Sequence, residues 1–335
     1  MEIVPATPAP ELREITGWAN SPPLSVKGLK GSVILLDCWT YTCSFCLRTL
    51  PVLRRLHEKY AMHGLRVIEA HSYEYEFAKD PANIARALAR YNVNEVPVAY
   101  DTSNKTWDAY GNTYWPKHVL IDGNGLVRYE HAGYGTIVDF EDAVVELLRE
   151  AGQSIEAELD KDDPKDEIYE TYGIQFAGMA PEICVGYSRL RRFGNNQKLK
   201  PDAANYVSDS PSHEMNVVYL RGKWVWERER VSIADRATKD SRPPAVMMHY
   251  NSARRVHAIL GTTDGRPGKA EIRVDGKPLS KDNLGRDCVI EGERSVVNID
   301  WPFMYNVAKT PEPEVHEVEV SPLSDNFAFY TFAFG

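Results

Sequence analysis

The sequence predicts an α/β domain followed by an all-β domain. Up to about residue 151, short apolar runs alternate with segments in which apolar residues recur at helical spacing, the order typical of α/β folds. Residues 153–165 are charged and polar, as expected of a linker. Beyond about residue 180 helical periodicity largely stops, and short β-rich runs indicate a sandwich or jelly roll. We therefore expect one domain at residues 1–151, a linker at 152–179 and a second domain at 180–335.

Length and composition are those of an ordinary globular protein. The chain has 335 residues, of which 43% are hydrophobic and 26% charged, so each half can bury a core. The net charge of −9 argues against nucleic-acid and anionic-membrane partners. No apolar run approaches the roughly 20 residues that cross a bilayer. Residues 1–5 contain no signal-peptide pattern. We expect a soluble, cytoplasmic protein with no nucleic-acid or membrane partner.

The elements of the first domain follow from periodicity. Residues 1–30 are Pro-rich and poorly periodic. Residues 33–37 predict a central strand, because a near-continuous apolar run is typical of a strand buried on both faces. Residues 44–63 predict a helix with apolar residues at helical spacing. We then expect a strand at 65–70, a helix at 81–91, a strand at 96–100 and a short helix or turn at 105–110.

The end of the first domain is marked by a proline and a turn. Pro116 precedes an apolar run, and because proline cannot donate to a ladder it belongs at the first residue of that strand. Residues 122–125 are a strong turn that returns into a strand at 126–129, and residues 139–151 predict a closing helix. In the second domain we expect strands at 217–220, 223–226, 246–250, 256–260, 270–274, 296–299, 315–320 and 327–334.

Cys43 and Cys46 form a Cys-x-x-Cys pair between the first strand and the first long helix. The first turn of a helix has unsatisfied N–H groups and the positive end of the helix dipole, and a thiol there is more readily ionised. A second thiol one turn on can resolve a mixed disulfide formed by the first. A half zinc site is the alternative, but it needs two further ligands, and no second Cys-x-x-Cys exists. The pair therefore indicates thiol–disulfide exchange, with no metal and no cofactor besides the Cys43–Cys46 disulfide.

These residues resemble the thioredoxin signature. Asp37, Trp39 and the cysteine pair have the spacing of Asp-Phe-Trp-x-x-x-Cys-x-x-Cys, with Cys38 in place of Phe. Pro51 matches the proline that kinks the thioredoxin active-site helix. Residues 39–43 and 47–51 look like the soluble C-terminal region of DipZ-type proteins, which belong to the TlpA-like branch of the superfamily. The resemblance implies a thioredoxin-like fold followed by a β-sandwich similar to a carbohydrate-binding module.

The resemblance also implies roles for individual residues. Cys43 would be the attacking thiolate and Cys46 the resolving thiol. Asp37, which is costly to ionise on a buried strand without a partner, would manage the proton of Cys46. Pro116 would be the cis-proline beside the cysteines, and the Trp115 backbone would hold the substrate. Two further residues, Tyr41 and Thr42, are candidates for shaping the surface around the thiolate, although both could simply pack.

Other residues have competing interpretations. We expect Cys38 to be a small buried hydrophobe, and Cys184 and Cys288 to be buried free thiols rather than a bridge. For Trp224 and Trp226, which lie two apart on one face of a strand, core packing is favoured over stacking on sugars.

Three polar residues near the predicted strand ends stay ambiguous. His71 and Glu74 follow a strand end, where α/β sheets place their sites, but a solvated loop is the favoured interpretation. His118, two residues beyond the proline, is similarly open.

We expect a thiol–disulfide oxidoreductase acting on a protein or small-molecule thiol or disulfide, with an upstream electron donor or acceptor protein and possible carbohydrate or protein contact by the second domain. A cytoplasmic location would favour a reductant. One alternative is a peroxiredoxin-like thiol peroxidase, since Thr40 stands where that family has one, although Leu36 replaces its proline. The other is a non-enzymatic binding protein that acts through the β-sandwich.

Overall fold

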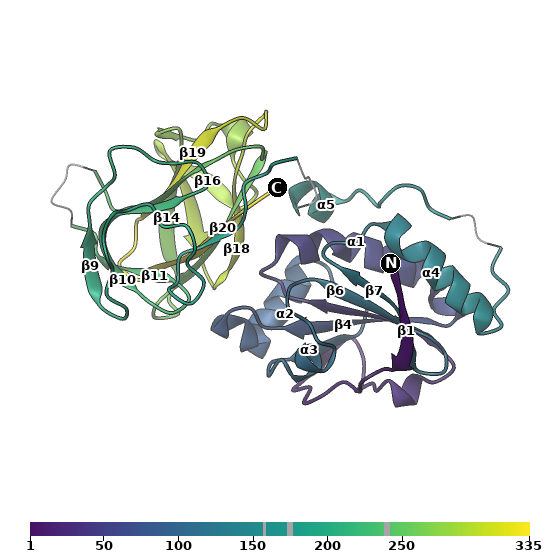
Figure 1. The fold of residues 1–335 in the computed structure, drawn as a ribbon. Coiled ribbons are helices and arrows are strands. Elements are labelled where there is room, and N and C mark those ends of the chain that lie inside the picture. Colours follow the sequence, from purple (N-terminus) through teal and green to yellow (C-terminus); the bar gives the residue numbers. More distant parts are fainter. Residues whose placement is uncertain (157–158, 173–176, 238–241) are drawn as a thin grey trace. The chain divides into compact units, whose positions relative to one another are not determined.

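The computed structural model describes residues 1–156, 159–172, 177–237 and 242–335. They form two units, Met1–Gly173 and Ile174–Gly335 (Figure 1). The first unit is α/β and the second is largely β-sheet, as the sequence predicts.

The first unit is built on a seven-stranded mixed sheet in the order β1-β7-β6-β3-β4-β5-β2. Strands β3, β4 and β5 are parallel, whereas β6 and β7 run antiparallel to their neighbours. Every residue of β3 is buried, which explains its unbroken apolar run. The strands are β1 (Glu2–Pro8), β2 (Trp18–Ala19), β3 (Val33–Trp39), β4 (Leu65–Ser72), β5 (Val98–Asp101), β6 (Lys117–Ile121) and β7 (Leu126–Ala132).

Helices cover both faces of this sheet. Two long helices, α1 and α4, share one apolar core with the odd-numbered side chains of β3, and α3 packs on the opposite face through Trp107. The helices are α1 (Ser44–Tyr60), α2 (Pro81–Arg90), α3 (Lys105–Ala109), α4 (Ile137–Glu150) and α5 (Glu167–Tyr172), with 3-10 turns at Lys27–Leu29, Ala61–His63, Glu76–Lys79 and, in the second unit, Lys281–Asn283. The Cys43–Cys46 pair, at the start of α1, therefore lies on the face of the sheet that α1 and α4 cover.

Two parts of the first unit contain elements that periodicity did not indicate. Strand β1 lies among the Pro-rich first residues and pairs only with β7, so its prolines fall on an edge strand, where a missing donor is tolerated. Helix α5 lies within residues 152–179, which the sequence analysis assigned to a linker, and it packs against α1. Arg54 of α1 reaches Asp166 at 3.5 Å. Tyr172 packs edge-on against Tyr91.

The second unit consists of two antiparallel sheets that share one strand, as in a sandwich with a corner strand. Its strands are β8 (Ile183–Cys184), β9 (Ala204–Val207), β10 (Val218–Trp226), β11 (Val231–Asp235), β12 (Ala245–Tyr250), β13 (Arg255–Thr262), β14 (Gly268–Val274), β15 (Lys277–Pro278), β16 (Cys288–Glu291), β17 (Arg294–Ile299), β18 (Phe303–Lys309), β19 (His316–Pro322) and β20 (Phe327–Phe334).

Strand β10 changes sheets at Gly222. Before this residue β10 pairs with β12, and from it onward β10 pairs with β9 and β11. Gly222 has φ +104°, a left-handed conformation that side chains other than glycine rarely adopt. The predicted runs at 217–220 and 223–226 are therefore one strand that bends at this glycine.

Candidate active site

Cys43 is the residue that caps the N-terminus of α1. Strand β3 ends at Trp39, and after a short turn Cys43 takes extended dihedrals before the helix begins. Its Sγ accepts the backbone N–H of Cys46 at 3.4 Å, and its carbonyl accepts the Leu47 N–H at 3.1 Å. The side chain is half-buried, so an incoming disulfide can reach it. Helix N–H groups that point at a sulfur stabilise its thiolate.

Cys46 lies behind Cys43 and is fully buried. Burial raises the pKa of its thiol well above the usual value, and Cys43 and then Asp37 raise it further. The two thiols therefore differ by position. A substrate can reach Cys43, whereas Cys46 is buried and held as a protonated thiol.

The Trp115–Pro116 peptide bond is cis, as the resemblance implied. Pro116 is buried immediately before β6, and Trp115 is half-buried. The Trp115 indole donates to Ser72 Oγ at 2.8 Å and stacks on Trp107 with centroids 4.2 Å apart. These contacts fix the side chain of Trp115.

Tyr41 and Thr42 are buried under the turn that leads to Cys43. The Tyr41 ring stacks on His71 with centroids 5.2 Å apart. The Thr42 hydroxyl donates to Glu74 Oε2 at 2.6 Å. Tyr41 therefore ties the turn to the end of β4, and Thr42 ties it to the segment that follows β4.

The expectation of a solvated loop at His71 is wrong. Strand β4 continues to Ser72, and His71 is fully buried with its ring edge-on to Trp39. Burial lowers the pKa of His71 to about 3, so the ring is neutral near neutral pH. Periodicity missed this because polar residues at the end of a buried strand resemble the start of a loop.

Asp37 is fully buried and lies between two other ionisable side chains. On β6, His118 Nε2 is 3.2 Å from Asp37 Oδ1. On β4, Glu69 is the register partner of Asp37. Sequence reasoning singled out Asp37 and left His118 ambiguous, but it missed Glu69. The alternation of β4 would have revealed Glu69, since it shares a face with Leu65 and Val67.

The remaining cysteines differ in burial. Cys38 is a buried small residue as expected, and burial raises its pKa to about 12. Cys288 is buried, and desolvation likewise raises its pKa to about 12. Cys184 is half-buried rather than buried, because β8 is a short edge strand paired with β20. All three are free thiols, as expected.

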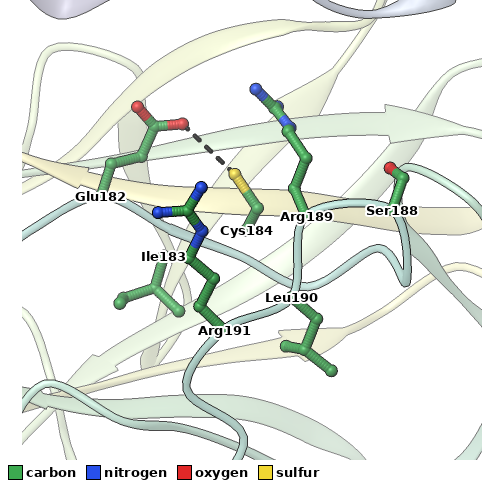
Figure 2. A pocket seen from close by; sticks show the side chains of 7 residues that line it. All are labelled: Glu182, Ile183, Cys184, Ser188, Arg189, Leu190 and Arg191. Atoms are coloured by element: carbon green, nitrogen blue, oxygen red, sulfur yellow. Dashed lines mark hydrogen bonds between the residues drawn. The ribbon is translucent and has the colours of Figure 1, made fainter.

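Cys184 lines a cavity of about 320 Å³ in the second unit. Figure 2 shows its thiol facing the carboxylate of Glu182, to which it donates at 3.5 Å. The cavity is lined by Glu182, Ile183, Cys184, Ser188, Arg189, Leu190 and Arg191. This lining carries both signs of charge.

The two tryptophans of β10 differ in burial. Trp224 is fully buried and its indole donates to the Arg221 carbonyl, so it belongs to the core as expected. Trp226 is half-buried, and its indole donates to the Val185 carbonyl at 2.9 Å. These contacts give no support to sugar stacking.

The described part of the chain lacks two features, a cluster of metal ligands and a long apolar helix. There, no group of three or more His, Cys, Asp or Glu side chains is arranged to hold a metal ion. Among the same residues, no helix is both long and apolar enough to cross a membrane.

A Cys-x-x-Cys pair at the start of α1, with a cis-proline before β6 of a mixed sheet, defines a protein of the thioredoxin superfamily. Residues 5–146 match the Redoxin family, and residues 180–335 match the family described as "Thioredoxin like C-terminal domain". DipZ of Mycobacterium tuberculosis is 32% identical over 276 residues, which cover 81% of this chain and 37% of DipZ. The chain is a DipZ-like member of the superfamily.

Two other relatives match a shorter part of the chain. SUPPRESSOR OF QUENCHING 1 of Arabidopsis thaliana is 35% identical over 144 residues, which cover 43% of this chain and 14% of that protein. Thiol-disulfide oxidoreductase YkuV of Bacillus subtilis is 26% identical over 143 residues, which cover 43% of this chain and 95% of YkuV. The chain spans little more than a third of the length of its DipZ relatives.

Proposed function

We propose that the chain is a thiol–disulfide oxidoreductase that works through the Cys43–Cys46 dithiol. The observation that carries the proposal is the asymmetry of the two thiols. Cys43 is half-buried at the N-terminus of α1, whereas Cys46 is fully buried one turn further on, with a pKa raised by desolvation. Such a pair supplies one nucleophile that a substrate can reach and one resolving thiol that it cannot.

The exchange proceeds in two displacements. The Cys43 thiolate attacks one sulfur of a substrate disulfide, so that a Cys43–substrate disulfide forms and one substrate thiolate leaves. Cys46 then loses its proton and attacks Cys43 Sγ, which forms the Cys43–Cys46 disulfide and releases the second thiolate. The substrate gains two electrons and the dithiol loses two. A thiol donor restores the dithiol by the reverse sequence.

The neighbouring residues have distinct roles in this scheme. Asp37, whose charge opposes ionisation of Cys46, takes the proton that Cys46 loses. The Trp115 backbone beside Pro116 binds the substrate chain. Tyr41 and Thr42 act from behind by holding the turn in place, through the ring of His71 and a hydrogen bond to Glu74.

Protein thiols or disulfides and a redox partner protein are the proposed substrates and partners. Relatives named as thiol-disulfide oxidoreductases support this class, and YkuV matches along nearly its whole length. A peroxidase of the peroxiredoxin type is less well supported, since Leu36 occupies the place of that motif's proline. The alternative of a binding protein gives no account of the dithiol.

Trapping of the mixed disulfide tests the proposal. A Cys46→Ala variant keeps the nucleophile but cannot resolve the intermediate, so it should remain joined to a disulfide-containing peptide through Cys43. Mass spectrometry under non-reducing conditions detects the adduct, and a Cys43→Ala variant is the matched control. An adduct of equal yield in both variants would refute the assignment of Cys43.

A further inference from the structure

Four ionisable side chains form a row across the sheet at the level of the dithiol. Strand register pairs Asp37 of β3 with Glu69 of β4 on one side and with His118 of β6 on the other. His118 is in turn paired with His131 of β7. Because side chains alternate between the faces of a sheet, paired residues share a face, and this face is the one covered by α1 and α4. We call these four residues the ionisable row.

The row leads from the buried site toward the surface. Asp37 and His118 are both 0% exposed, and 3.2 Å separates Oδ1 of the first from Nε2 of the second. The His118 ring packs on Phe140 of α4 and lies 5.9 Å from the ring of His131. His131 is half-exposed, and its Nε2 is 2.9 Å from the Tyr134 carbonyl oxygen. A proton on Asp37 therefore has an adjacent imidazole, and beyond it a second imidazole that reaches water.

The opposite end of the row does not offer the same path. Glu69 is fully buried, and desolvation, followed by the charge of Asp37, raises its pKa well above the usual value, while Arg54 opposes the rise. Burial therefore favours the protonated form of the Glu69 carboxyl. A protonated carboxyl has no capacity to accept the proton of a neighbouring acid.

The other ionisable groups that face the row come from three elements. They are Cys46 and Arg54 on α1, His71 on β4 and Asp139 on α4. His71 is neutral and packs on Trp39 and Tyr41 rather than on Asp37.

We propose that His118 receives from Asp37 the proton that Cys46 loses, and that His131 passes it to solvent. As Cys46 attacks the mixed disulfide, its S–H proton moves to the Asp37 carboxylate, and the electron pair of the S–H bond forms the new S–S bond. Asp37 then gives the proton to the His118 imidazole, from which it passes to His131 and then to water. Imidazole suits this step because it gains and loses protons near neutral pH. The departing substrate thiolate takes its own proton from water.

This inference rests on the proposed function, and it makes His118 a positioning residue for proton transfer, since it acts through Asp37. The experiment is rapid mixing of the reduced, full-length chain with dithiobis(nitrobenzoate), which releases one coloured thiolate in each displacement. The first phase reports attack by Cys43. The second phase reports attack by Cys46 and hence its deprotonation.

His118→Gln should slow the second phase about tenfold near pH 7 and leave the first phase unchanged, because general acid–base assistance is lost only in the second displacement. The loss should shrink as the pH is raised, because hydroxide then deprotonates Cys46 without help. Glu69→Gln is the matched control, since it replaces the other neighbour of Asp37 by a neutral isostere. It should change neither phase by more than about twofold. His131→Gln should also slow the second phase.

The outcomes separate the two claims. If the wild-type chain releases only one thiolate and forms no Cys43–Cys46 disulfide, the proposed function itself fails. If both phases occur but His118→Gln leaves the second unchanged, or slows both phases equally at every pH, the relay is overturned. An equal loss in Glu69→Gln also overturns it. Should His118→Gln fail to fold, His131→Gln decides, and an unchanged second phase in that variant rejects the relay.

Discussion

Burial determines which ionisable side chains carry charge in this protein. Desolvation raises the pKa of the thiols of Cys38 and Cys46, which keeps both protonated, while half-buried Cys43 accepts the backbone N–H of Cys46 at the start of α1. The same effect lowers the pKa of the buried histidines His71 and His257 to about 3. Among these thiols and imidazoles, the half-buried Cys43 can react, whereas burial favours the neutral form of the others.

The neutral state of His257 makes the second unit sensitive to acid. Its folded pKa of about 3 lies below the usual value of 6.5, so between these values the unfolded chain binds a proton that the folded chain does not. Stability therefore falls as the pH drops below about 6.5. We expect the loss between pH 7 and pH 5 to be about 2 kcal/mol from this group.

Urea unfolding of the full chain at both pH values, monitored by a signal from the second unit, measures this change. His257→Asn removes the group and should reduce the loss. A His257→Asn variant with the same pH dependence as the wild type would show that other groups govern acid sensitivity.

Residues of the candidate site differed in how far the sequence could predict them. Sequence spacing predicted the residues that belong to one local motif or to the start of a strand. These are Cys43, Cys46, Asp37 and Pro116. The partners of Asp37 were not predictable in the same way, because Glu69 and His118 reach it only through the lateral register of β4 and β6. Register is a tertiary property, set when strands distant in sequence pair.

At the level of elements, the sequence predicts the helices and strands that bury a complete face and misses strands that depend on distant partners. Periodicity predicted β3, α1, β4, α2 and α4 to within a few residues, since each buries one complete face. It missed β1, whose prolines are acceptable only at an edge, and the strands β11 and β18. Such elements are stabilised by pairing with distant strands rather than by their own pattern.

The bend of β10 gives a prediction at this scale. An added Cβ at Gly222 would lie 2.7 Å from Pro244 Cβ, and the residue has φ +104°. Gly222→Ala should therefore lower the free energy of unfolding of the second unit by about 1–3 kcal/mol.

Gly265→Ala is the matched control for this change. Gly265 also has a positive φ, of +71°, but an added Cβ would meet nothing within 4 Å. The control thus carries backbone strain without the steric clash and should cost less. Denaturant unfolding of both variants gives the comparison, and an equal loss would show that the contact with Pro244 is easily relieved.

At the level of the whole molecule, each structural unit corresponds to one family match. The Redoxin match at residues 5–146 lies within the first unit, and the match at 180–335 fills most of the second. All residues assigned here to thiol exchange belong to the first unit. We therefore predict that only one pair of the five cysteines is redox-active.

Titration of the full chain in thiol–disulfide buffers, with differential alkylation and mass spectrometry at each cysteine, tests that claim most directly. Cys43 and Cys46 should oxidise together, with a tenfold change in their equilibrium over about 30 mV, as a two-electron couple requires. Cys38, Cys184 and Cys288 should form no protein disulfide in the same range. If Cys43 and Cys46 never form a reversible pair, or if either pairs instead with another cysteine, their assignment as the redox-active dithiol is wrong.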